Sequence, residues 1–562
     1  MRRTRASLAV AVTPLLFLPV VPALGDTTET ETTTGVVFHD ADGDRVRDAG
    51  EEGIAGVLVS NGTDIVRTDA EGAYKLSVDD QTTIFVTKPS GWMVPVDDQN
   101  LPQFYYNHYP NGSPVELRYG GVEPTGPLPE SVDFALRPQD ESGEFTSLTF
   151  ADPQTSTRAQ IDMMGKDVVA ELEGSDALFG LTVGDVINDP LDLFDYHNDT
   201  VARIGIPWWN LPGNHDMDYD APSDANATDT FIQHFGPTNY SFNYGDVHII
   251  ALDNVEKKGA ARGYIGALSE DQLAWIEKDL AEVPDDTLIV IAAHIPLVNE
   301  AMLDAAGNNT LRREQLFDLL EDRPHLYSIA GHDTSNSWQT DIDSRWGFDG
   351  EVPLHHQTLA EVRGAGWNRG PLDERGVRQA DMADGTPNGY YTMTWDGAEV
   401  TPQYKPASLP ADFLMRIGFE DDNRSYVPGG PSGSGDFEEP VVWHPREISG
   451  SDDENDLHPR VEVNVFDGGA RNVVEMSVDG RPFTTMTHLE PTTDDYLTAL
   501  HEKYAGTPDD PGTPEWNSSH LWSAALPGDL APGTHEVTVR STSAWGQVSE
   551  RTSEFTIRSG RP

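Results

Sequence analysis

Acidic, amide and imidazole side chains follow five apolar runs of this chain, at the point where each run ends. The runs cover residues 147–150, 177–183, 206–212, 287–293 and 325–330 and have the composition of buried strands. We expect the polar side chains to lie on loops at one edge of a sheet. Oxygen ligands combined with imidazoles bind pairs of divalent metals, and such a pair activates water and holds both oxygens of a phosphoryl transfer. The polar segments are Phe150-Ala151-Asp152-Pro153-Gln154, Gly184-Asp185-Val186, Gly213-Asn214-His215-Asp216, Ala293-His294-Ile295-Pro296 and Gly331-His332-Asp333-Thr334.

The elements that must position these segments alternate between strands and helices. Apolar residues at helical spacing predict a helix over 157–174, with Ile161, Met164, Val168 and Leu172 on one face. A second helix is expected over 269–283 with Ser269 as its N-cap, and a third over 311–323. The alternation predicts an α/β region, which we bound at residues 141–405.

Regions rich in short strands flank this middle part. Residues 26–140 contain alternating runs at 56–62, 64–78 and 83–89, separated by turn residues, and predict a β-sandwich. Residues 406–562 contain runs at 460–467, 473–480, 535–542 and 553–559 and predict a second β-sandwich, with no helix expected there. The chain of 562 residues thus divides into three domains.

Composition excludes several classes of protein. The net charge of −57 argues against a nucleic-acid-binding surface, because such surfaces are basic. The charge either recruits cations or forms a solvated, self-repelling surface, and we favour the second reading. The chain has no cysteine, which excludes thiol-based phosphatases, thiolate zinc sites and disulfides.

The N-terminus has the pattern of a secretory signal peptide. Arg2, Arg3 and Arg5 precede an apolar stretch over 8–24, and Ala23-Leu24-Gly25 has the form of a cleavage site. We therefore assign residues 1–25 to a signal peptide and expect a secreted, extracellular or cell-envelope protein. No later run approaches the roughly 18 apolar residues of a membrane span.

An acidic loop in the first domain suggests a separate metal site. Acidic residues occupy positions 1, 3, 5, 9 and 12 of the loop that begins at Asp40, as in an EF-hand loop. Position 6 is Arg45, however, where the EF-hand requires glycine. The alternatives are a structural calcium site and an ordinary acidic turn. The candidate ligands are Asp40, Asp42, Asp44, Asp48 and Glu51.

The ordered motifs resemble those of the calcineurin-like metallophosphoesterase superfamily, whose pattern is D-x-H, GD, GNH-D/E, an isolated His and GHxH. Residues 235–254 and 384–390 resemble a bacterial branch with β-domains on both sides of the catalytic domain. The resemblance implies a four-layer αββα core and two divalent metal ions (Mn, Fe, Zn or Mg). It also implies a hydrolase that cleaves phosphate mono- or diesters by attack of a metal-activated hydroxide.

The resemblance also assigns roles to individual residues. Asp185 would bridge the two metals, and Asp152 would bind the first. His215 would face the substrate and act on the leaving oxygen, with Asp216 orienting its ring. The remaining ligands of the second metal would be Asn214, His294 and His332.

Two departures from the pattern affect the first metal. Gln154 and Thr334 stand where the superfamily has histidines. The site would then consist of Asp152, Asp185 and the Gln154 carbonyl, and would prefer a harder ion held less tightly. Asp333, His355 or His356 could supply a missing ligand; alternatively, Asp333 is a loop carboxylate facing solvent.

Three hypotheses for function follow. The first is an active phosphoesterase acting on small esters, because the negative charge would repel polyanions. The second is a degenerate one-metal protein that binds phosphorylated ligands, and the third is a surface or matrix module with little turnover. Arg369, Arg375 and Arg378 could contact substrate oxygens, although pairing with surface carboxylates is the simpler reading.

Overall fold

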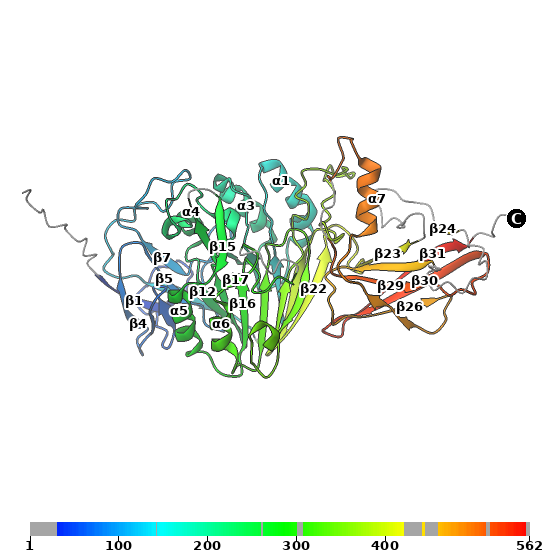
Figure 1. The fold of residues 1–562 in the computed structure, drawn as a ribbon. Coiled ribbons are helices and arrows are strands. Elements are labelled where there is room, and N and C mark those ends of the chain that lie inside the picture. Colours follow the sequence, from blue (N-terminus) through cyan, green and yellow to red (C-terminus); the bar gives the residue numbers. More distant parts are fainter. Residues whose placement is uncertain are drawn as a thin grey trace, which may run out of the picture.

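The structure is a computed structural model that describes residues 31–141, 143–259, 262–300, 307–420, 441–443, 459–512 and 517–557. The signal peptide expected over 1–25 lies outside these residues. Two β-rich regions stand at opposite ends of a central α/β region (Figure 1). No helix in the described ranges has the length and apolar character needed to cross a membrane.

Two sheets face each other in the central region. The first, sheet A, has the order β11-β10-β9-β21-β22, with β9, β10 and β11 parallel and β21 antiparallel to β9. Every residue of β10 and β11 is buried, as expected for parallel strands covered on both faces. Sheet A consists of β9 (Phe145–Phe150), β10 (Phe179–Val183), β11 (Trp208–Leu211), β21 (Gly389–Asp396) and β22 (Glu399–Pro406).

The second, sheet B, has the order β12-β13-β16-β18-β20-β19 with four parallel strands in its centre. The five motif segments are therefore divided between two sheets, three following sheet A strands and two following sheet B strands, and the expectation of a single sheet edge is wrong. Sheet B consists of β12 (Tyr240–Tyr244), β13 (Val247–Leu252), β16 (Leu288–Ala293), β18 (Leu326–Ala330), β19 (Trp338–Ile342) and β20 (Leu354–Thr358). A small sheet beside it contains β14 (Val255–Lys258), β15 (Gly263–Ala267) and β17 (Thr310–Leu311).

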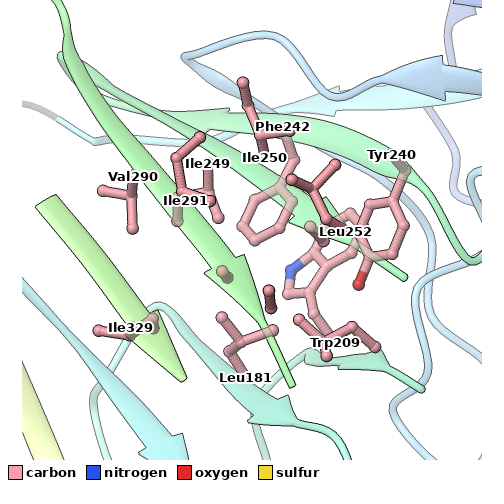
Figure 2. Close-up of a cluster of buried hydrophobic side chains, with 14 of the residues drawn as sticks. Leu181, Trp209, Tyr240, Phe242, Ile249, Ile250, Leu252, Val290, Ile291 and Ile329 are labelled. Carbon is pink, nitrogen blue, oxygen red and sulfur yellow. The ribbon is translucent and has the colours of Figure 1, made fainter. Parts of the chain in front are cut away.

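Apolar side chains fill the space between the sheets. Leu181 and Trp209 of sheet A meet side chains of sheet B, including Phe242 and Ile291 (Figure 2). The rings of Trp209 and Phe242 are stacked with centroids 4.3 Å apart. This core fixes the two sheets face to face, so the carboxyl ends of their parallel strands can converge.

Helices cover the outer faces of both sheets. On sheet A, α1 (Arg158–Met164), a π-helical turn η1 (Gly165–Val169) and α2 (Ala170–Leu172) form one continuous helical segment, and Ile161, Met164 and Val168 pack in its core as expected. On sheet B lie α5 (Glu270–Leu280), capped by Ser269 as expected, and α6 (Arg313–Leu320). The αββα prediction is confirmed. The remaining helices of this region are η2 (Leu191–Leu193), α3 (Phe194–Val201), η3 (Ala202–Ile204), η4 (Asn214–Asp216), η5 (Asp224–Asn226), α4 (Asp229–Phe235) and η7 (Ser344–Trp346).

The N-terminal region forms two four-stranded sheets. Their orders are β4-β1-β8-β6 and β3-β2-β5-β7. Lys88 joins this region to sheet B: its Nζ forms a buried ion pair with Glu141 Oε1 at 2.6 Å and donates to the carbonyl of Asn243 in β12. The strands are β1 (Glu31–His39), β2 (Leu58–Ser60), β3 (Ile65–Arg67), β4 (Ala73–Val78), β5 (Thr82–Thr87), β6 (Trp92–Met93), β7 (Tyr105–His108) and β8 (Phe134–Pro138).

The C-terminal region is also a pair of sheets, of orders β23-β25-β29-β28 and β24-β31-β30-β26-β27. It contains a helix that was not expected, α7 (Asp495–Tyr504), whose first turn is capped by the Asp494 side chain. The strands are β23 (Met415–Glu420), β24 (Val441–Trp443), β25 (Arg460–Val465), β26 (Val473–Val478), β27 (Thr484–Thr485), β28 (Thr487–His488), β29 (Leu521–Ala525), β30 (Gly533–Thr542) and β31 (Val548–Ile557).

Buried polar contacts join the C-terminal region to the central one. The His520 ring lies 2.9 Å from the Asp384 carboxylate, and neither side chain is exposed. Asn464 donates a hydrogen bond to the Asp384 carbonyl, and Gln357 of β20 donates to both oxygens of Asp467. These contacts hold the loop at 384–388 against the C-terminal sheets.

Candidate metal centre

Five motif side chains meet where strands of the two sheets end. Asp152 follows β9, Asp185 follows β10 and Asn214 follows β11 in sheet A, while His294 follows β16 and His332 follows β18 in sheet B. The convergence follows from the facing arrangement of the sheets, since the polar residues lie beyond the last buried apolar position of each strand.

Glycines in the motifs allow the loops to approach this point. A Cβ atom at Gly213 would lie 2.1 Å from Asp185 Oδ1, and one at Gly331 would lie 2.2 Å from Asp152 Oδ2. Either contact is too short for two non-bonded atoms, so no residue with a side chain fits without moving a carboxylate. These glycines are therefore required by the close passage of backbone past the two acidic residues.

Asp152, Asp185 and His294 form a compact buried group. Each offers a ligand atom within 4.8 Å of the others. His294 Nε2 lies 3.3 Å from Asp185 Oδ1, and its Nδ1 lies 3.0 Å from the Val183 carbonyl. Because a carbonyl can only accept, Nδ1 carries a hydrogen, and the Nε2 atom faces the carboxylates.

The pKa shifts of this group indicate that positive charge is favoured at its centre. Burial alone would lower the pKa of His294, but the charges of Asp185 and Asp152 outweigh it and raise that pKa to about 9. Burial raises the pKa of Asp152 to about 7. Burial also opposes ionisation of Asp185, yet the adjacent histidines hold the pKa of its carboxyl below the ordinary value. In the metal-free chain a protonated His294 compensates the carboxylates.

Asn214 and His332 complete a set of potential metal ligands around His294. Asn214 Oδ1 lies 3.1 Å and His332 Nδ1 lies 3.2 Å from His294 Nε2. Burial and the neighbouring His294 charge lower the pKa of His332 to about 3, so its ring is neutral and has a free lone pair. Two imidazoles, an amide oxygen and a carboxylate are a suitable ligand set for a transition metal or zinc.

Two buried oxygen atoms beside these ligands receive no hydrogen bond. Gln154 Nε2 donates to Asp185 Oδ2 at 2.8 Å, and the His332 amide donates to Asp152 Oδ2 at 2.9 Å. Asp152 Oδ1 and Gln154 Oε1 are buried and have no hydrogen-bond partner within the described part of the chain. A buried acceptor left without a donor costs about 1–3 kcal/mol, and a cation would satisfy both oxygens. The residues present therefore fit a metal ion.

The backbone at the site is strained. Asp152, Gln154, Asp185 and His332 have φ angles of 46°, 38°, 48° and 72°. Non-glycine residues in this region cost about 1–3 kcal/mol each and are concentrated at functional sites. The strain is consistent with a backbone held so that four side chains face one point.

His215 contacts Asp189, not Asp216. Its Nδ1 lies 2.7 Å from Asp189 Oδ1, and Arg262 pairs with the other oxygen of Asp189 at 2.6 Å. The Asp216 carboxylate instead accepts hydrogen bonds from the backbone amides of Val186, Ile187 and Gly213. The expectation that Asp216 orients the His215 ring is therefore wrong: Asp216 is buried beneath the loops that follow β10 and β11 and ties them together.

The charges around His215 favour its protonated form. Burial would lower the pKa of the imidazole, but the nearby carboxylates of Asp185 and Asp189 raise it above its ordinary value. The side chain keeps 26% of its surface exposed, in contrast with the buried His294. His215 can therefore reach a molecule in solvent, and its surroundings favour the form that has a proton to donate.

Comparisons with known proteins agree with this geometry. A family model described as the N terminal of calcineurin-like phosphoesterase matches residues 40–121, and one described as the C terminal of calcineurin-like phosphoesterase matches residues 362–548. These two matches lie on either side of the motif segments. Both flanks of the motif segments are thus similar to calcineurin-like phosphoesterases. The predicted superfamily is thereby confirmed.

Individual relatives match a smaller part of this chain. It is 30% identical over 148 residues to a probable glycerophosphodiester phosphodiesterase, GpdQ, of Arcobacter nitrofigilis (26% of this chain, 50% of the relative). It is 28% identical over 158 residues to the 3',5'-cyclic adenosine monophosphate phosphodiesterase CpdA of Escherichia coli K12 (27% and 52%). The chain thus spans about half the length of the curated relatives it matches.

A solved structure is also similar, but only distantly. The purple acid phosphatase PPD1 from yellow lupin (Lupinus luteus) seeds matches with 13% identity and a TM-score of 0.33, over 68% of each chain. A similarity at this level carries no weight for fold or function.

The residues considered as replacement ligands are engaged elsewhere. Asp333 is buried and accepts hydrogen bonds from Asn299 Nδ2 and the Ser335 amide, so it neither faces solvent nor joins the compact group. His355 pairs with Asp341, and His356 Nδ1 lies 3.0 Å from Ser328 Oγ. None of the three supplies the ligand that the superfamily has at the position of Thr334.

Two of the three arginines considered for substrate pair with carboxylates. Arg375 lies 2.9 Å from Asp167 and 2.6 Å from Asp373. Arg378 lies 3.6 Å from Asp509. This agrees with the simpler reading for both residues. Arg369 lies near Gly512 of the C-terminal region.

Sequence reasoning missed Glu361. This carboxyl is fully buried, and both of its oxygens have no hydrogen-bond donor among the residues that the structure describes. Burial and the charge of Asp152 raise its pKa well above the ordinary value. Glu361 belongs to no recognisable motif, so only the fold brings it to the metal centre.

The acidic loop of the N-terminal region is partly assembled for a cation. Asp40, Asp42 and Asp44 offer oxygens within 4.8 Å of one another, but Asp48 and Glu51 are not in this group. Glu51 accepts hydrogen bonds from the amides of Ala41 and Asp48. Arg45 adopts a φ of 68°, so it takes the left-handed conformation for which the EF-hand uses glycine.

Proposed function

We propose that the chain is a secreted, metal-dependent phosphoesterase that hydrolyses small phosphate esters, with diesters preferred over monoesters. The observation that carries the proposal is the convergence of Asp152, Asp185 and His294, with Asp152 Oδ1 and Gln154 Oε1 left without donors. The diester preference is supported by the relatives, whose names give them phosphodiester substrates. Secretion is supported by the N-terminal sequence.

The proposed ligands divide between two ions. Asp152 and Gln154 would hold the first ion. The second ion would be held by Asn214, His294 and His332. Asp185 would bind both ions. Divalent ions bound there supply Lewis-acid chemistry, by polarising the phosphoryl group and lowering the pKa of water. Mn, Fe, Zn or Mg suits the second set, while the oxygen-rich first set favours a hard ion such as Mn or Mg.

His215 is the proposed proton donor. Its side chain is partly exposed, and Asp189 holds its Nδ1 at 2.7 Å, which leaves Nε2 to donate a proton to the leaving oxygen. Buried Asp216 fixes the loops that carry His215 and Asp185 and does not contact the substrate.

A small cavity lies between the loops beside this centre and helix α7. A cavity of about 150 Å³ is lined by Thr334 and Arg363 on the side of the metal centre and by Leu497, Leu500 and His501 of α7. A cavity of this volume is compatible with the small-ester substrates proposed here. The net charge of −57 disfavours polyanionic substrates at low salt.

Metal analysis of the purified protein combined with hydrolysis assays tests the proposal. We expect two ions per catalytic region and metal-dependent turnover of an aryl phosphate diester across Mn²⁺, Zn²⁺, Fe²⁺ and Ca²⁺, with slower turnover of the monoester. Asp185→Asn should abolish turnover and lower the metal content, whereas His215→Ala should lower turnover and retain the metals. One ion and no turnover with any metal would overturn the proposal in favour of a phospho-ligand-binding protein.

We further propose a structural calcium ion at Asp40, Asp42 and Asp44, which would rigidify the N-terminal sandwich. Three carboxylates within 4.8 Å of one another support it. Calcium should raise the unfolding temperature of the wild-type chain, and Asp42→Asn with Asp44→Asn should remove the increase. An equal increase in the double variant would contradict it.

A further inference from the structure

The first metal set has fewer ligands than the second. Gln154 and Thr334 replace the two imidazoles of the superfamily pattern, which leaves Asp152, Asp185 and the Gln154 carbonyl. None of Asp333, His355 and His356 supplies a further ligand. A divalent ion with so few protein ligands would be bound weakly.

The connection after β20 passes directly beside this set. The Leu359 amide donates to the Ala330 carbonyl at the end of β18, and the Val362 amide donates to the Ala151 carbonyl at the end of β9. The Arg363 amide then lies 3.3 Å from the Asp152 carbonyl. Residues 359–363 thus bridge the ends of the two sheets, and Glu361 stands in the middle of the bridge.

The environment of Glu361 lacks hydrogen-bond donors. The side chain is fully buried, and neither oxygen has a hydrogen-bond partner in the described ranges. Its nearest cation, Arg363, has Nε 3.7 Å from Oε2, but that Nε–H donates to the Gly364 carbonyl instead. A buried carboxyl without donors is unfavourable unless a cation approaches it.

The unsatisfied acceptors gather in one region. Asp152 Oδ1 and Gln154 Oε1 share this property with both oxygens of Glu361. Asp152 is also the charged group that most strongly disfavours ionisation of Glu361. Buried acceptor oxygens that lack donors are the environment that a hard divalent cation requires.

We propose that Glu361 supplies the carboxylate that completes the first metal set, in place of the histidines absent at Gln154 and Thr334. This inference rests on the two-metal function proposed above. The resulting set is Asp152, Gln154, Asp185 and Glu361, in which every ligand atom is oxygen. The chain therefore has a mixed pair, with an oxygen-only site for Mn²⁺ or Mg²⁺ beside a site with two imidazoles.

The position of Glu361 sets a condition on binding. It is not part of the compact group formed by Asp152, Asp185 and His294, whose ligand atoms lie within 4.8 Å of one another. Its side chain must therefore turn toward Asp152 when the ion binds. The second ion can be held without this step, so we expect the two ions to bind in order.

Isothermal titration of metal-free, full-length mature protein with Mn²⁺ tests the inference. The wild type should bind two ions in two phases. Glu361→Gln, which is isosteric with the protonated acid, should retain the tight phase and weaken the other by about 10- to 100-fold. The spin-coupled signal of a manganese pair in electron paramagnetic resonance should be lost in the same variant. Glu361→Asp, which keeps the charge, should lie between the two and serves if Glu361→Gln does not fold.

Asp333→Asn is the matched control. It is also a buried carboxylate at the same edge, but its oxygens already have donors, so both phases should be retained. Two ions in the wild type and unchanged binding in Glu361→Gln would overturn this inference and leave the proposed function intact. A wild type that binds a single ion or none would overturn both.

Discussion

Asp189 Oδ1 lies 2.7 Å from Nδ1 of His215, and Asp189 Oδ2 pairs with Arg262. One carboxylate thus connects a partly exposed imidazole to a guanidinium. The contact fixes the tautomer and the direction of the ring, because Nδ1 faces the carboxylate and Nε2 remains free. Asp189 is not a metal ligand, so its effect on turnover separates from its effect on metal binding.

Asp189→Asn should lower kcat by about 10- to 100-fold with little change in metal content. The amide keeps the shape but removes the charge that helps to raise the pKa of His215. Steady-state kinetics combined with metal analysis checks this. Asp192→Asn, an exposed carboxylate three residues further along, should behave as the wild type. Unchanged kcat in Asp189→Asn, or loss of metal, would refute the assigned role.

Added metal should stabilise the chain against heat. A ligand that binds only the folded state stabilises it by about 2.7 kcal/mol at a hundred times its Kd, and here the ion would also satisfy Asp152 Oδ1 and Gln154 Oε1. Differential scanning calorimetry of the metal-free chain with and without Mn²⁺ measures the effect. Asp185→Asn should lose most of the increase because Asp185 contributes to both sites. The same increase in both proteins would place the stabilising ion elsewhere.

Asp467 should make stability depend on pH. Burial raises the pKa of its carboxyl to about 7, compared with about 3.9 in an unfolded chain. The folded state therefore holds a proton that the unfolded state has released, and the stability present below about pH 4 is lost as the pH rises to 7. Asp467→Asn keeps a neutral side chain at a φ of 54°, which asparagine tolerates.

The unfolding temperature of Asp467→Asn should therefore exceed that of the wild type at pH 8 and approach it at pH 4.5. Thermal melts across this range measure the difference. Asp529→Asn, in which the wild-type carboxylate is exposed and pairs with Arg481, should gain nothing as the pH rises. A difference between Asp467→Asn and the wild type that is constant with pH would contradict the prediction.

The parts of the site that could be predicted from sequence are those that follow strands. Asp152, Asp185 and His294 each follow an apolar run, and the end of such a run can be recognised in the sequence alone. Asp189 and Glu361 could not be found in this way, because they lie on connections without periodicity. Their positions depend on the loop path after β10 and on the bridge between the two sheets.

The fold shows a similar division. The layers of the central region follow from strand and helix periodicity, but the assignment of five motif strands to two sheets depends on pairing between distant segments. The sequence of helix α7 contains a local helix signal. Asp494 precedes Tyr496, Leu497 and Leu500, which are buried on one face of the helix. The surrounding turn-rich sequence obscured this short segment.

The pairing of Asp384 with His520 affects how the protein unfolds. Both side chains are fully buried, and each belongs to a different region of the chain. Separating the regions would leave an unpaired carboxylate in one region and an unpaired imidazole in the other. Unfolding of either region alone therefore costs additional free energy. The central and C-terminal regions should melt as a single cooperative unit. A truncation after β22 would then report on the loss of this cooperativity, and inactivity of the fragment would say nothing about which region performs the chemistry.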